Sequence, residues 1–403
     1  MEDWITAKNS SSNGQKVNVP KLRFPGFEGE YVEFRIGEIY AERNERGEPE
    51  KELLSVTQND GVVPRSEIDG KNNASEDRSN YKVVRIGDMV YNSMRMWQGA
   101  NGISSLDGIV SPAYTVLCPR TEIVNGYFAV LFKTPGLINE FRKNSQGLTS
   151  DTWNLKYPQI SRIRVYIPSV QEQRKIAELL SRLDARIEAQ HQLVESLKKY
   201  KRGLLNKVFS NIGGKIYPTV YLSEVADFLQ GLTYSPRDVA DSGYLVLRSS
   251  NIRNGMLSFE DCVYVDKKVT ESLQVKRDDV IMCVRNGSKS LVGKTALISK
   301  DMPMITWGAF MMIIRSKLND TYVFHYLNSQ MFFSQVFKDT GTATINQITK
   351  GILTECKLPL PPEEIRKKIS KVLSSFDVKI QNTERYLVAL LEERKAFLQQ
   401  LFI

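Results

Sequence analysis

The sequence has few of the residues that build metal centres and disulfide frameworks. It contains only two histidines and four cysteines, Cys118, Cys262, Cys283 and Cys356, none of which stands in a CxxC pair. Zinc sites need closely spaced Cys and His, and disulfide-rich domains need paired cysteines. We therefore expect no metal site, no disulfide framework, and a reduced, cytoplasmic protein.

Long apolar runs and the signatures of common enzymes are also missing. No apolar stretch reaches the length of a bilayer span, and no secretory signal opens the chain. The motifs GxGxxG, HExxH, GxSxG and Asn-Pro-Pro-aromatic are absent. The segment GSKSLVGKT at 287–295 comes close to the phosphate loop GxxxxGK[ST], but it has one residue too many between its glycines and continues as a strand pattern. The sequence therefore carries none of these catalytic signatures.

The remaining composition is that of a globular protein with a basic balance. A chain of 403 residues is long enough for two or three domains, and 41% hydrophobic with 25% charged residues is ordinary. The net charge is +9 and the pI is about 9.1. This balance favours a polyanionic partner, although many basic proteins bind no nucleic acid.

Two long amphipathic stretches of the chain repeat one another. The run over 168–210 lies on the run over 361–403 without a gap when it is shifted by 193 positions, which places Pro168 on Pro361 and Asp184 on Asp377. Two unrelated amphipathic helices would not agree over this length. The sequence therefore indicates an internal duplication.

Apolar residues recur every three or four positions in both runs, the heptad pattern of a helix that packs along another helix. Polar residues interrupt the pattern at matching levels, with Gln190 on Thr383 and Lys201 on Arg394. Such interruptions suit control of register better than stability. The predicted apolar contact positions, called the seam below, are Ile176, Leu180, Leu183, Ile187, Val194, Leu197 and Leu204 in the first run and Ile369, Leu373, Phe376, Ile380, Leu387, Leu390 and Phe397 in the second.

A region of short apolar runs and turn residues precedes each long helix. The second region repeats the first, because IGEI at 36–39 falls on LSEV at 222–225 and RIGDMVYN at 85–92 falls on KRDDVIMC at 276–283. Both regions predict mixed strands and helices. The predicted boundaries are a mobile tail over 1–19, a first globule over 20–167, a first long helix over 168–212, a second globule over 213–360 and a second long helix over 361–403.

The order of these parts predicts how the helices pair. A helix of about 40 residues is roughly 60 Å long. A parallel pair would require the second globule to carry the chain back over that distance, whereas an antiparallel pair requires no return. We therefore expect an α+β tandem repeat whose two long antiparallel helices form an intramolecular coiled coil, with a pseudo-twofold relation that suits a DNA site of two inverted halves.

These features resemble the specificity subunit of type I restriction–modification systems, from about Pro20 to the end of the chain. The resemblance rests on two globules alternating with two long helices and on the opening PKLRFPGF at 20–27. It also rests on the helix-start motifs IP..QEQRKIA.LL..LD..I at Ile167 and LP.EEIRKKIS.VL..FD..I at Leu360. The second motif has no glutamine where Gln173 stands in the first.

The resemblance implies a non-catalytic DNA sequence-recognition subunit. Each globule would be a target-recognition domain for one half of a bipartite site, and the helix pair would set the gap. Two modification subunits would carry S-adenosylmethionine and methylate adenine, and restriction subunits would use ATP and Mg; this chain would hold no cofactor. A stand-alone bipartite DNA-binding protein and a coiled-coil interaction protein without DNA binding are the alternatives.

Polar loop residues at equivalent places in the two globules are the candidates for DNA contact. Arg, Lys, Asn and Gln read base edges, and Lys, Arg, Ser and Thr contact phosphates. The candidates are Gln58, Asn59, Asn92, Arg95, Trp97, Gln98, Thr149 and Thr152 in the first globule and Asn251, Arg253, Asn254, Arg285, Asn286, Ser288, Lys289, Lys294, Thr342, Thr344 and Asn346 in the second. Solvated turns are the alternative for each position, and Trp97 also suits a core. His325, which lies among aromatic residues, is expected to be structural.

Overall fold

A computed structural model describes residues 5–6, 18–58, 60–69, 74–149, 152–212, 217–337 and 347–403, without the side chains of 5–6 and 210–212. The chain divides into two compact units. Unit 1 comprises residues 1–190 and 386–403, and unit 2 comprises residues 191–385. Most of the predicted tail over 1–19 lies outside the described residues, but β1 (Ile5–Thr6) pairs with β2 (Leu22–Arg23).

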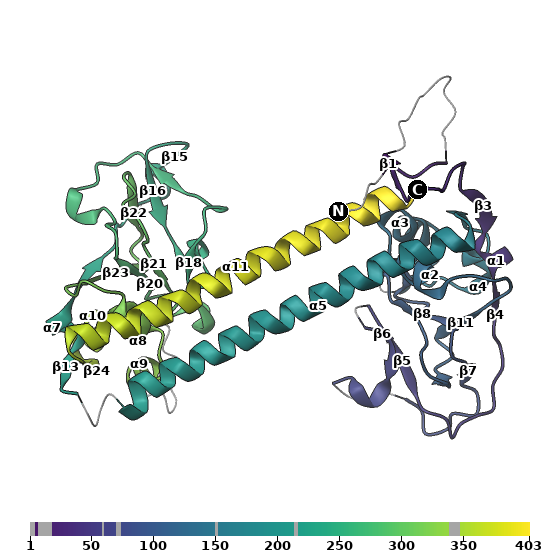
Figure 1. The fold of residues 1–403 in the computed structure, drawn as a ribbon, viewed down its shortest axis with the longest axis horizontal. Helices are drawn as coiled ribbons and strands as arrows, with labels where there is room; N and C mark the ends of the chain where they lie inside the picture. The colour runs from purple at the N-terminus through teal and green to yellow at the C-terminus, as the bar shows by residue number, and fades with distance from the viewer. Residues whose placement is uncertain are drawn as a thin grey trace. The chain divides into compact units, whose positions relative to one another are not determined.

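Two long helices contribute one segment each to both units. They are α5 (Val170–Asn206), drawn in teal in Figure 1, and α11 (Glu363–Leu401), drawn in yellow. A π-helical turn, Lys207–Ile212, continues α5. Both helices start close to the predicted positions, each after a proline-containing segment.

The globule of unit 1 is built mainly from antiparallel strands and short helices. Its elements are β3 (Val32–Arg35), α1 (Ile36–Ile39), β4 (Tyr40–Glu42), β5 (Leu54–Thr57), β6 (Gly61–Pro64), β7 (Lys82–Val84), β8 (Met89–Asn92), β9 (Asn101–Ile103), β10 (Gly108–Val110), β11 (Tyr114–Pro119), α2 (Asn125–Leu131), α3 (Pro135–Asn144), α4 (Tyr157–Ile160) and β12 (Arg164–Ile167). The main sheet has the order β4-β11-β8-β9, and β12 pairs with β3.

The globule of unit 2 follows the same plan with more strands. Its elements are β13 (Thr219–Tyr221), α7 (Leu222–Val225), β14 (Ala226–Gln230), β15 (Val239–Ala240), β16 (Tyr244–Leu247), β17 (Ile252–Arg253), β18 (Met256–Leu257), β19 (Tyr264–Val265), β20 (Val280–Cys283), β21 (Thr295–Leu297), β22 (Ile305–Trp307), β23 (Met311–Ser316), α8 (Tyr322–Leu327), α9 (Gln330–Val336), α10 (Lys350–Glu355) and β24 (Lys357–Pro359). One sheet has the order β14-β23-β20-β21, a second has the order β15-β19-β16-β22, and β13 pairs with β24.

The repeat predicted from the sequence extends to single hydrogen bonds. In the first turn of α1 and of α7, a glutamate carboxylate accepts a hydrogen bond from the backbone N–H three residues earlier. Glu38 accepts from Arg35 at 2.6 Å, and Glu224 accepts from Tyr221 at 2.7 Å. A carboxylate in this place satisfies an N–H group that the first turn of a helix leaves unpaired.

Each globule packs its core onto both long helices. In unit 1 the core shared with β-strands and α2 includes Ile176 of α5 together with Leu401 and Phe402 from the end of the chain. In unit 2 the core includes Phe209 after α5 and Leu373 of α11. Phe402 stacks on Tyr127 at 5.3 Å between ring centroids, and its repeat counterpart Phe209 contacts Tyr322 at 5.1 Å.

The segments of α5 and α11 run antiparallel within each unit, as predicted. In unit 1, Asp184 of α5 pairs with Arg394 of α11. Two residues later in α5, Arg186 lies over the ring of Tyr386, which comes earlier in α11 than Arg394. In unit 2 the corresponding contacts are Lys198 with Glu384 at 3.0 Å and Lys201 with Asp377. The partner number falls as the α5 number rises, which only an antiparallel pair produces. The predicted fold class is therefore confirmed.

The polar positions of the two helices form the same ion pair in both units. The repeat places Asp184 on Asp377 and Lys201 on Arg394. Arg394 Nη2 donates to Asp184 Oδ2 at 3.2 Å in unit 1, and Lys201 pairs with Asp377 in unit 2. Partly exposed pairs of this kind add little free energy, but a charged residue that meets its partner in only one alignment specifies register.

Every predicted seam residue is buried or half-buried. The most enclosed are Ile176, Leu180 and Leu373, at 0%, 1% and 1% exposure. By contrast, two other valines of α11 are exposed, Val372 at 50% and Val388 at 59%. In the described parts of the chain, no helix combines the length and apolar character that crossing a membrane requires.

The sequence difference at the two helix starts has a structural reason. Gln173 donates to a proline carbonyl five residues earlier at 3.0 Å and accepts from the Val124 N–H, ahead of α2, at 3.1 Å. Arg366, its repeat counterpart, contacts the equivalent proline carbonyl and pairs with Asp320, ahead of α8, at 2.6 Å. Both residues are buried, so each ties its long helix to its own globule.

Two residues of the segment before β3, Arg23 and Tyr31, contact the start of α5 and the end of α11. Arg23 forms a buried two-pronged ion pair with Glu172, with distances of 2.9 and 2.8 Å. The hydroxyl of Tyr31 donates to the Leu401 carbonyl at 3.3 Å. An uncompensated partner of a buried ion pair is strongly destabilising, so Arg23 and Glu172 depend on each other.

His325 of α8 lies fully buried against α11 in unit 2. Its Nε2 is 3.1 Å from the Ser374 hydroxyl, and its Nδ1 is 3.9 Å from Asp377 Oδ2. The pKa of His325 is lowered to about 3, mainly because the imidazole is buried and to a smaller extent because the Lys201 cation is nearby. The imidazole is therefore neutral at neutral pH, which fits the structural role expected for it.

Truncation of the seam should be far more costly than truncation of the exposed face beside it. We expect Leu373→Ala to lower the free energy of unfolding by about 2–5 kcal/mol, because it leaves a cavity in the core of unit 2. Val372→Ala is the matched control and should change it by less than about 0.5 kcal/mol. Urea unfolding of the full chain measures both, and equal losses would contradict the packing described.

Acid should destabilise unit 2 through His325. The unfolded chain binds a proton near pH 6.5, whereas the folded pKa is about 3. The neutral imidazole makes its full contribution to the free energy of unfolding above pH 6.5. This contribution is lost as the pH falls from 6.5 towards 3, by at most about 1.4 kcal/mol per pH unit. Asp377 has a raised pKa from burial and shifts stability in the opposite direction.

The variant His325→Val isolates this contribution, because Asp377 is present in both proteins. Val130 occupies the equivalent place in α2. The equivalence follows from the hydroxyl residues after the two helices, because Thr134 after α2 and Ser329 after α8 each donate to the carbonyl three residues earlier. Thermal unfolding from pH 7 to pH 4.5 should show a flatter pH dependence for the variant. Parallel curves would show that His325 is not the group responsible.

Candidate nucleic-acid interface

The tip of the β5–β6 hairpin carries Gln58 in unit 1. This hairpin crosses β9 at close range, because a Cβ on Gly102 would lie only 2.7 Å from Gly61 Cα. Lys133, at the end of α2, donates to the Gln58 carbonyl at 3.2 Å. Burial, followed by the nearby Arg394 cation, lowers the pKa of Lys133. The Gln58 side chain is exposed.

The loop between β8 and β9 carries most other candidates of unit 1. Asn92 Oδ1 accepts the Met94 N–H at 3.0 Å, a turn that holds its amide within the loop. Arg95 and Gln98 are exposed. Among the described residues, Arg95 has no ion-pair partner.

A third segment, between α3 and α4, lies against this loop. Leu155 N–H donates to the Ser93 carbonyl at 2.8 Å, and Trp97 packs edge-to-face on Trp153 at 5.2 Å. Thr152 Oγ1 donates to the Thr149 carbonyl at 2.9 Å. Both tryptophans are half-buried, so they support the loop surface and are not part of the core of unit 1.

The candidates of unit 2 also converge from separate segments. Arg285 forms an isolated antiparallel bridge with Gln347, which brings the loop after β20 to the last candidate segment. Asn254, Lys289 and Lys294 line one hollow, between the β17–β18 hairpin and α9. The exposed lysines have no ion-pair partner among the described residues, so their charge is available for an anion.

Several candidates serve the loops themselves. Asn251 is fully buried, accepts the Arg248 N–H and donates to the Ser258 and Asp261 carbonyls, so we assign it a structural role. Asn286 donates to Ser249 and accepts the Ser288 N–H. Arg253 is paired with Glu260. Asn59, Thr342, Thr344 and Asn346 lie outside the described residues.

An aromatic residue missing from the candidates lies beside them. Phe310, which is 60% exposed, contacts the Arg285 guanidinium, whose central carbon is 5.3 Å from the ring centroid. The sequence hid it, because WGAFMMI at 307–313 has the apolar character of a buried strand. The only warning is that the matching run in the first globule, SPAYTVL, begins with turn residues.

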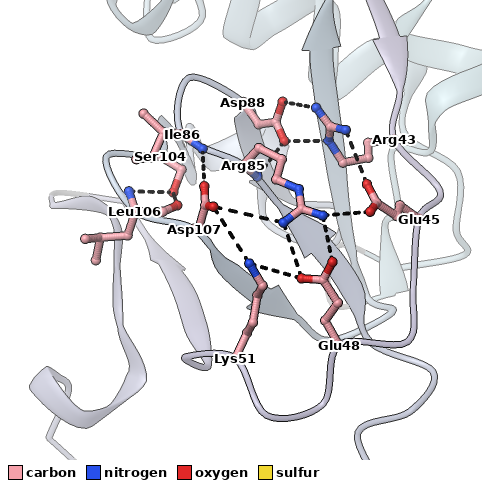
Figure 2. A network of polar contacts seen from close by, with 10 residues as sticks. All are labelled: Arg43, Glu45, Glu48, Lys51, Arg85, Ile86, Asp88, Ser104, Leu106 and Asp107. Carbon is pink, nitrogen blue, oxygen red and sulfur yellow. Dashed lines mark hydrogen bonds and ion pairs between the residues drawn. The ribbon is translucent and has the colours of Figure 1, made fainter.

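Ion pairs fix the strands that carry the two loops. In unit 1, Asp88, just before β8, binds Arg43 through distances of 2.7 and 3.0 Å (Figure 2). In unit 2, Asp279, just before β20, binds Arg315 at 2.7 and 2.8 Å. The carboxylate is repeated, while the arginine comes from different places, directly after β4 for Arg43 and within β23 for Arg315. Each loop-bearing strand is thus held at one end and presents its loop at the other.

Other basic residues of unit 1 are neutralised in the same network. Arg85 contacts Glu48 and Glu45 at 2.7 Å each, and Lys51 lies 3.1 Å from Glu48 (Figure 2). These hydrogen bonds, from Glu48 first, raise the pKa of Arg85. Because their charge is already paired, these residues are poor candidates for phosphate contact.

The structure offers little for a metal or a nucleotide phosphate. No group of three His, Cys, Asp or Glu side chains suited to a metal occurs within the described ranges. The segment at 287–295 leads into β21 and not into a helix. It therefore lacks the strand-to-helix turn that cradles phosphates in a phosphate loop.

Comparison with known proteins identifies the family. The family model described as "Type I restriction modification DNA specificity domain" matches residues 28–199 and 217–392. These segments contain both globules and most of both long helices, so the chain belongs to this family. It is a non-catalytic specificity subunit of a type I restriction–modification system.

Over the aligned regions, about a quarter of the residues of three sequence relatives are identical to those of this chain. The StySPI specificity subunit of Salmonella potsdam is 27% identical over 191 residues, which are 45% of this chain and 41% of the relative. The EcoKI specificity subunit of Escherichia coli K12 is 27% identical over 171 residues, 40% and 36% of the two chains. These matches span less than half of either relative. The MjaVIII specificity subunit of Methanocaldococcus jannaschii is 25% identical over 324 residues, 72% and 73% of the two chains.

Solved structures share the fold along nearly the whole chain. The S subunit from M. genitalium aligns with a TM-score of 0.61 and 15% identity, over 96% of this chain and 99% of that chain. A chain from a structural study of complex assembly and conformational transition of the type I R-M system aligns with a TM-score of 0.57 and 16% identity, over 92% and 95%.

The distinction between structural and contacting loop residues is testable with two variants. Asn251→Ala should lower the free energy of unfolding by about 1–3 kcal/mol, because buried carbonyls lose their donors. Lys289→Ala should leave unfolding unchanged but weaken DNA binding and reduce its salt slope by about 1 if the lysine contacts a phosphate. Thermal unfolding and a salt titration of DNA affinity provide the two measurements. The reverse pattern would overturn the assignments.

Proposed function

We propose that each unit reads one half of a bipartite DNA site and that the paired long helices set the gap between the halves. The observation that supports this most is the repeated construction of the two loop surfaces. In each unit a strand anchored by an aspartate ends in a polar loop with an exposed arginine, Arg95 or Arg285. Two similar but unequal surfaces suit two half-sites of different sequence.

The chemistry of these surfaces suits the DNA groove. Planar guanidinium and amide groups match base edges, and lysines match phosphates. The loop cations Arg95, Lys289 and Lys294 have no ion-pair partner among the described residues, in contrast to the paired Arg43 and Arg85 of the supporting network. The net charge of +9 favours association with DNA at long range.

The helix pair is suited to act as a spacer. The helices contain 37 and 39 residues, and the matched ion pairs define one alignment between them. We propose that their outer surfaces bind two modification subunits and that restriction subunits join this assembly. S-adenosylmethionine, ATP and Mg would then belong to those partners, and the methylated base would be adenine.

Co-expression with the modification subunit tests the proposal. Adenine methylation at a bipartite sequence should require this chain, and sequencing of the host DNA with methylation detection would show the site. Methylation of the same sites without the chain would refute the proposal. A steep fall of DNA affinity with salt is expected from phosphate contact, whereas a coiled-coil interaction protein would show no such dependence.

Lengthening both helices by one heptad should change the gap alone. Seven residues add about 10.5 Å, or about 3 base pairs at 3.4 Å per pair, so the half-sites should move apart by that amount. Insertions after Gln190 and after Arg385 lie at the boundary of the two units. Methylation mapping should find both half-sites unaltered, and a heptad in only one helix serves as the control that breaks the pairing.

An unchanged gap with altered half-sites would contradict the proposed role of the helices.

A further inference from the structure

We infer that Arg285 reads a guanine in the half-site bound by unit 2 and that Phe310 is the residue that positions it. This inference rests on the proposed function and assigns one base to one side chain. Its basis is an exposed arginine that lies against an exposed ring, on the wall of a concave surface.

The backbone of Arg285 is fixed from two sides. The N–H groups of Val284 and Arg285 both donate to the Phe310 carbonyl, at 3.0 and 3.2 Å, and Arg285 bridges Gln347. The next residue, Asn286, is tied to Ser249 at 3.1 Å. The arginine therefore projects from a framed segment, although it belongs to a loop.

The Phe310 ring restricts the guanidinium further. The guanidinium carbon lies 5.3 Å from the ring centroid, within the range of a cation–π contact. The ring covers the guanidinium carbon, and among the described residues no acceptor takes a hydrogen bond from the Arg285 side chain, so its N–H groups stay free for a partner. A pre-oriented planar fork loses less entropy when it forms two parallel hydrogen bonds.

Guanine is the base that matches this fork. In the major groove guanine presents two acceptors, O6 and N7, and a two-pronged arginine contact to them is the commonest specific pairing. Adenine presents one acceptor and one donor at the same edge, and the donor would face another donor. The free N–H edge of Arg285 therefore favours guanine.

The surroundings favour a base over a phosphate. A hollow of about 760 Å³ is lined by Arg285, Phe310, Tyr234 and Val239, together with polar residues of the β16–β17 segment. Phe310 and Val239 are 60% and 47% exposed, so the neighbourhood of the guanidinium is largely apolar. Apolar groups suit base edges and thymine methyl groups, whereas the lysines Lys289 and Lys294 of the same loop suit phosphates.

The first unit lacks this device. Arg95 occupies the corresponding loop without a ring contact among the described residues, and Trp97 packs on Trp153 instead. Nearby arginines of unit 2 are paired with carboxylates, Arg248 with Asp261 and Arg253 with Glu260. Of the two arginines that line this hollow, Arg248 and Arg285, only Arg285 lacks a carboxylate partner in the described part of the chain.

The test is DNA selection with the full chain, followed by base replacement. Sequencing of bound DNA from a random library should show an invariant guanine in one half-site. Replacing that guanine with 7-deazaguanine removes N7, and we expect it to weaken wild-type binding. Arg285→Ala should weaken binding to the guanine site by roughly 5- to 150-fold and should be insensitive to 7-deazaguanine.

Further variants separate reading from charge and from folding. Arg285→Lys should keep the salt slope but lose the preference for guanine. Phe310→Leu should reduce that preference by roughly 2- to 5-fold, and Phe310→Tyr should restore it, because the ring face is what holds the arginine. Phe259→Leu, at an exposed aromatic outside the hollow, is the matched control and should have no effect. Unchanged thermal unfolding shows that each variant folds.

The outcomes are distinguishable. If binding by Arg285→Ala is still weakened by 7-deazaguanine, another residue reads the guanine. If Arg285→Ala weakens binding to all sequences equally and with a smaller salt slope, Arg285 contacts a phosphate. Either result makes the inference wrong, while the proposed function stands. If Phe310→Leu behaves as wild type, the positioning role is wrong. If selection recovers no bipartite sequence, the proposed function itself fails.

Discussion

The packing of α5 against α11 is the contact on which the rest of the structure depends. Neither globule completes its core with its own half of the chain: unit 1 requires Leu401 and Phe402 from the end of α11, and unit 2 requires Leu205 and Phe209 from the end of α5. The antiparallel alignment is fixed by apolar seam residues, and the repeated carboxylate–cation pairs select the register. Folding of each globule is therefore coupled to the packing of the helix segments within its own unit.

The globules show how a duplicated scaffold can carry different surfaces. The anchors are retained, because Asp88 and Asp279 both end a turn and fix the strand behind the loop. The groups that face outward differ, with Trp97 and Trp153 packed together in one unit and Arg285 against Phe310 in the other. Internal hydrogen bonds thus preserve the position of a loop, while its exposed residues can differ between the two units.

Much of the fold was predictable, since heptad periodicity and a gapless repeat are consequences of helix geometry that survive in a single sequence. The matching polar positions Asp184 and Asp377 were visible as a pattern, although their partners needed coordinates. The surfaces were less predictable. Asn251 looked like a contact residue because asparagine suits both turns and bases, and its burial depends on distant carbonyls. Phe310 was missed because an exposed aromatic at the start of a strand has the same sequence pattern as a buried one.

The most direct test of the central claim, two reading units held by one helix pair, is a hydroxyl-radical footprint of the full chain with its modification subunits on a selected site. The account predicts two protected tracts separated by an unprotected stretch of constant length. A single continuous tract, or two tracts whose separation varies from one bound sequence to another, would contradict it.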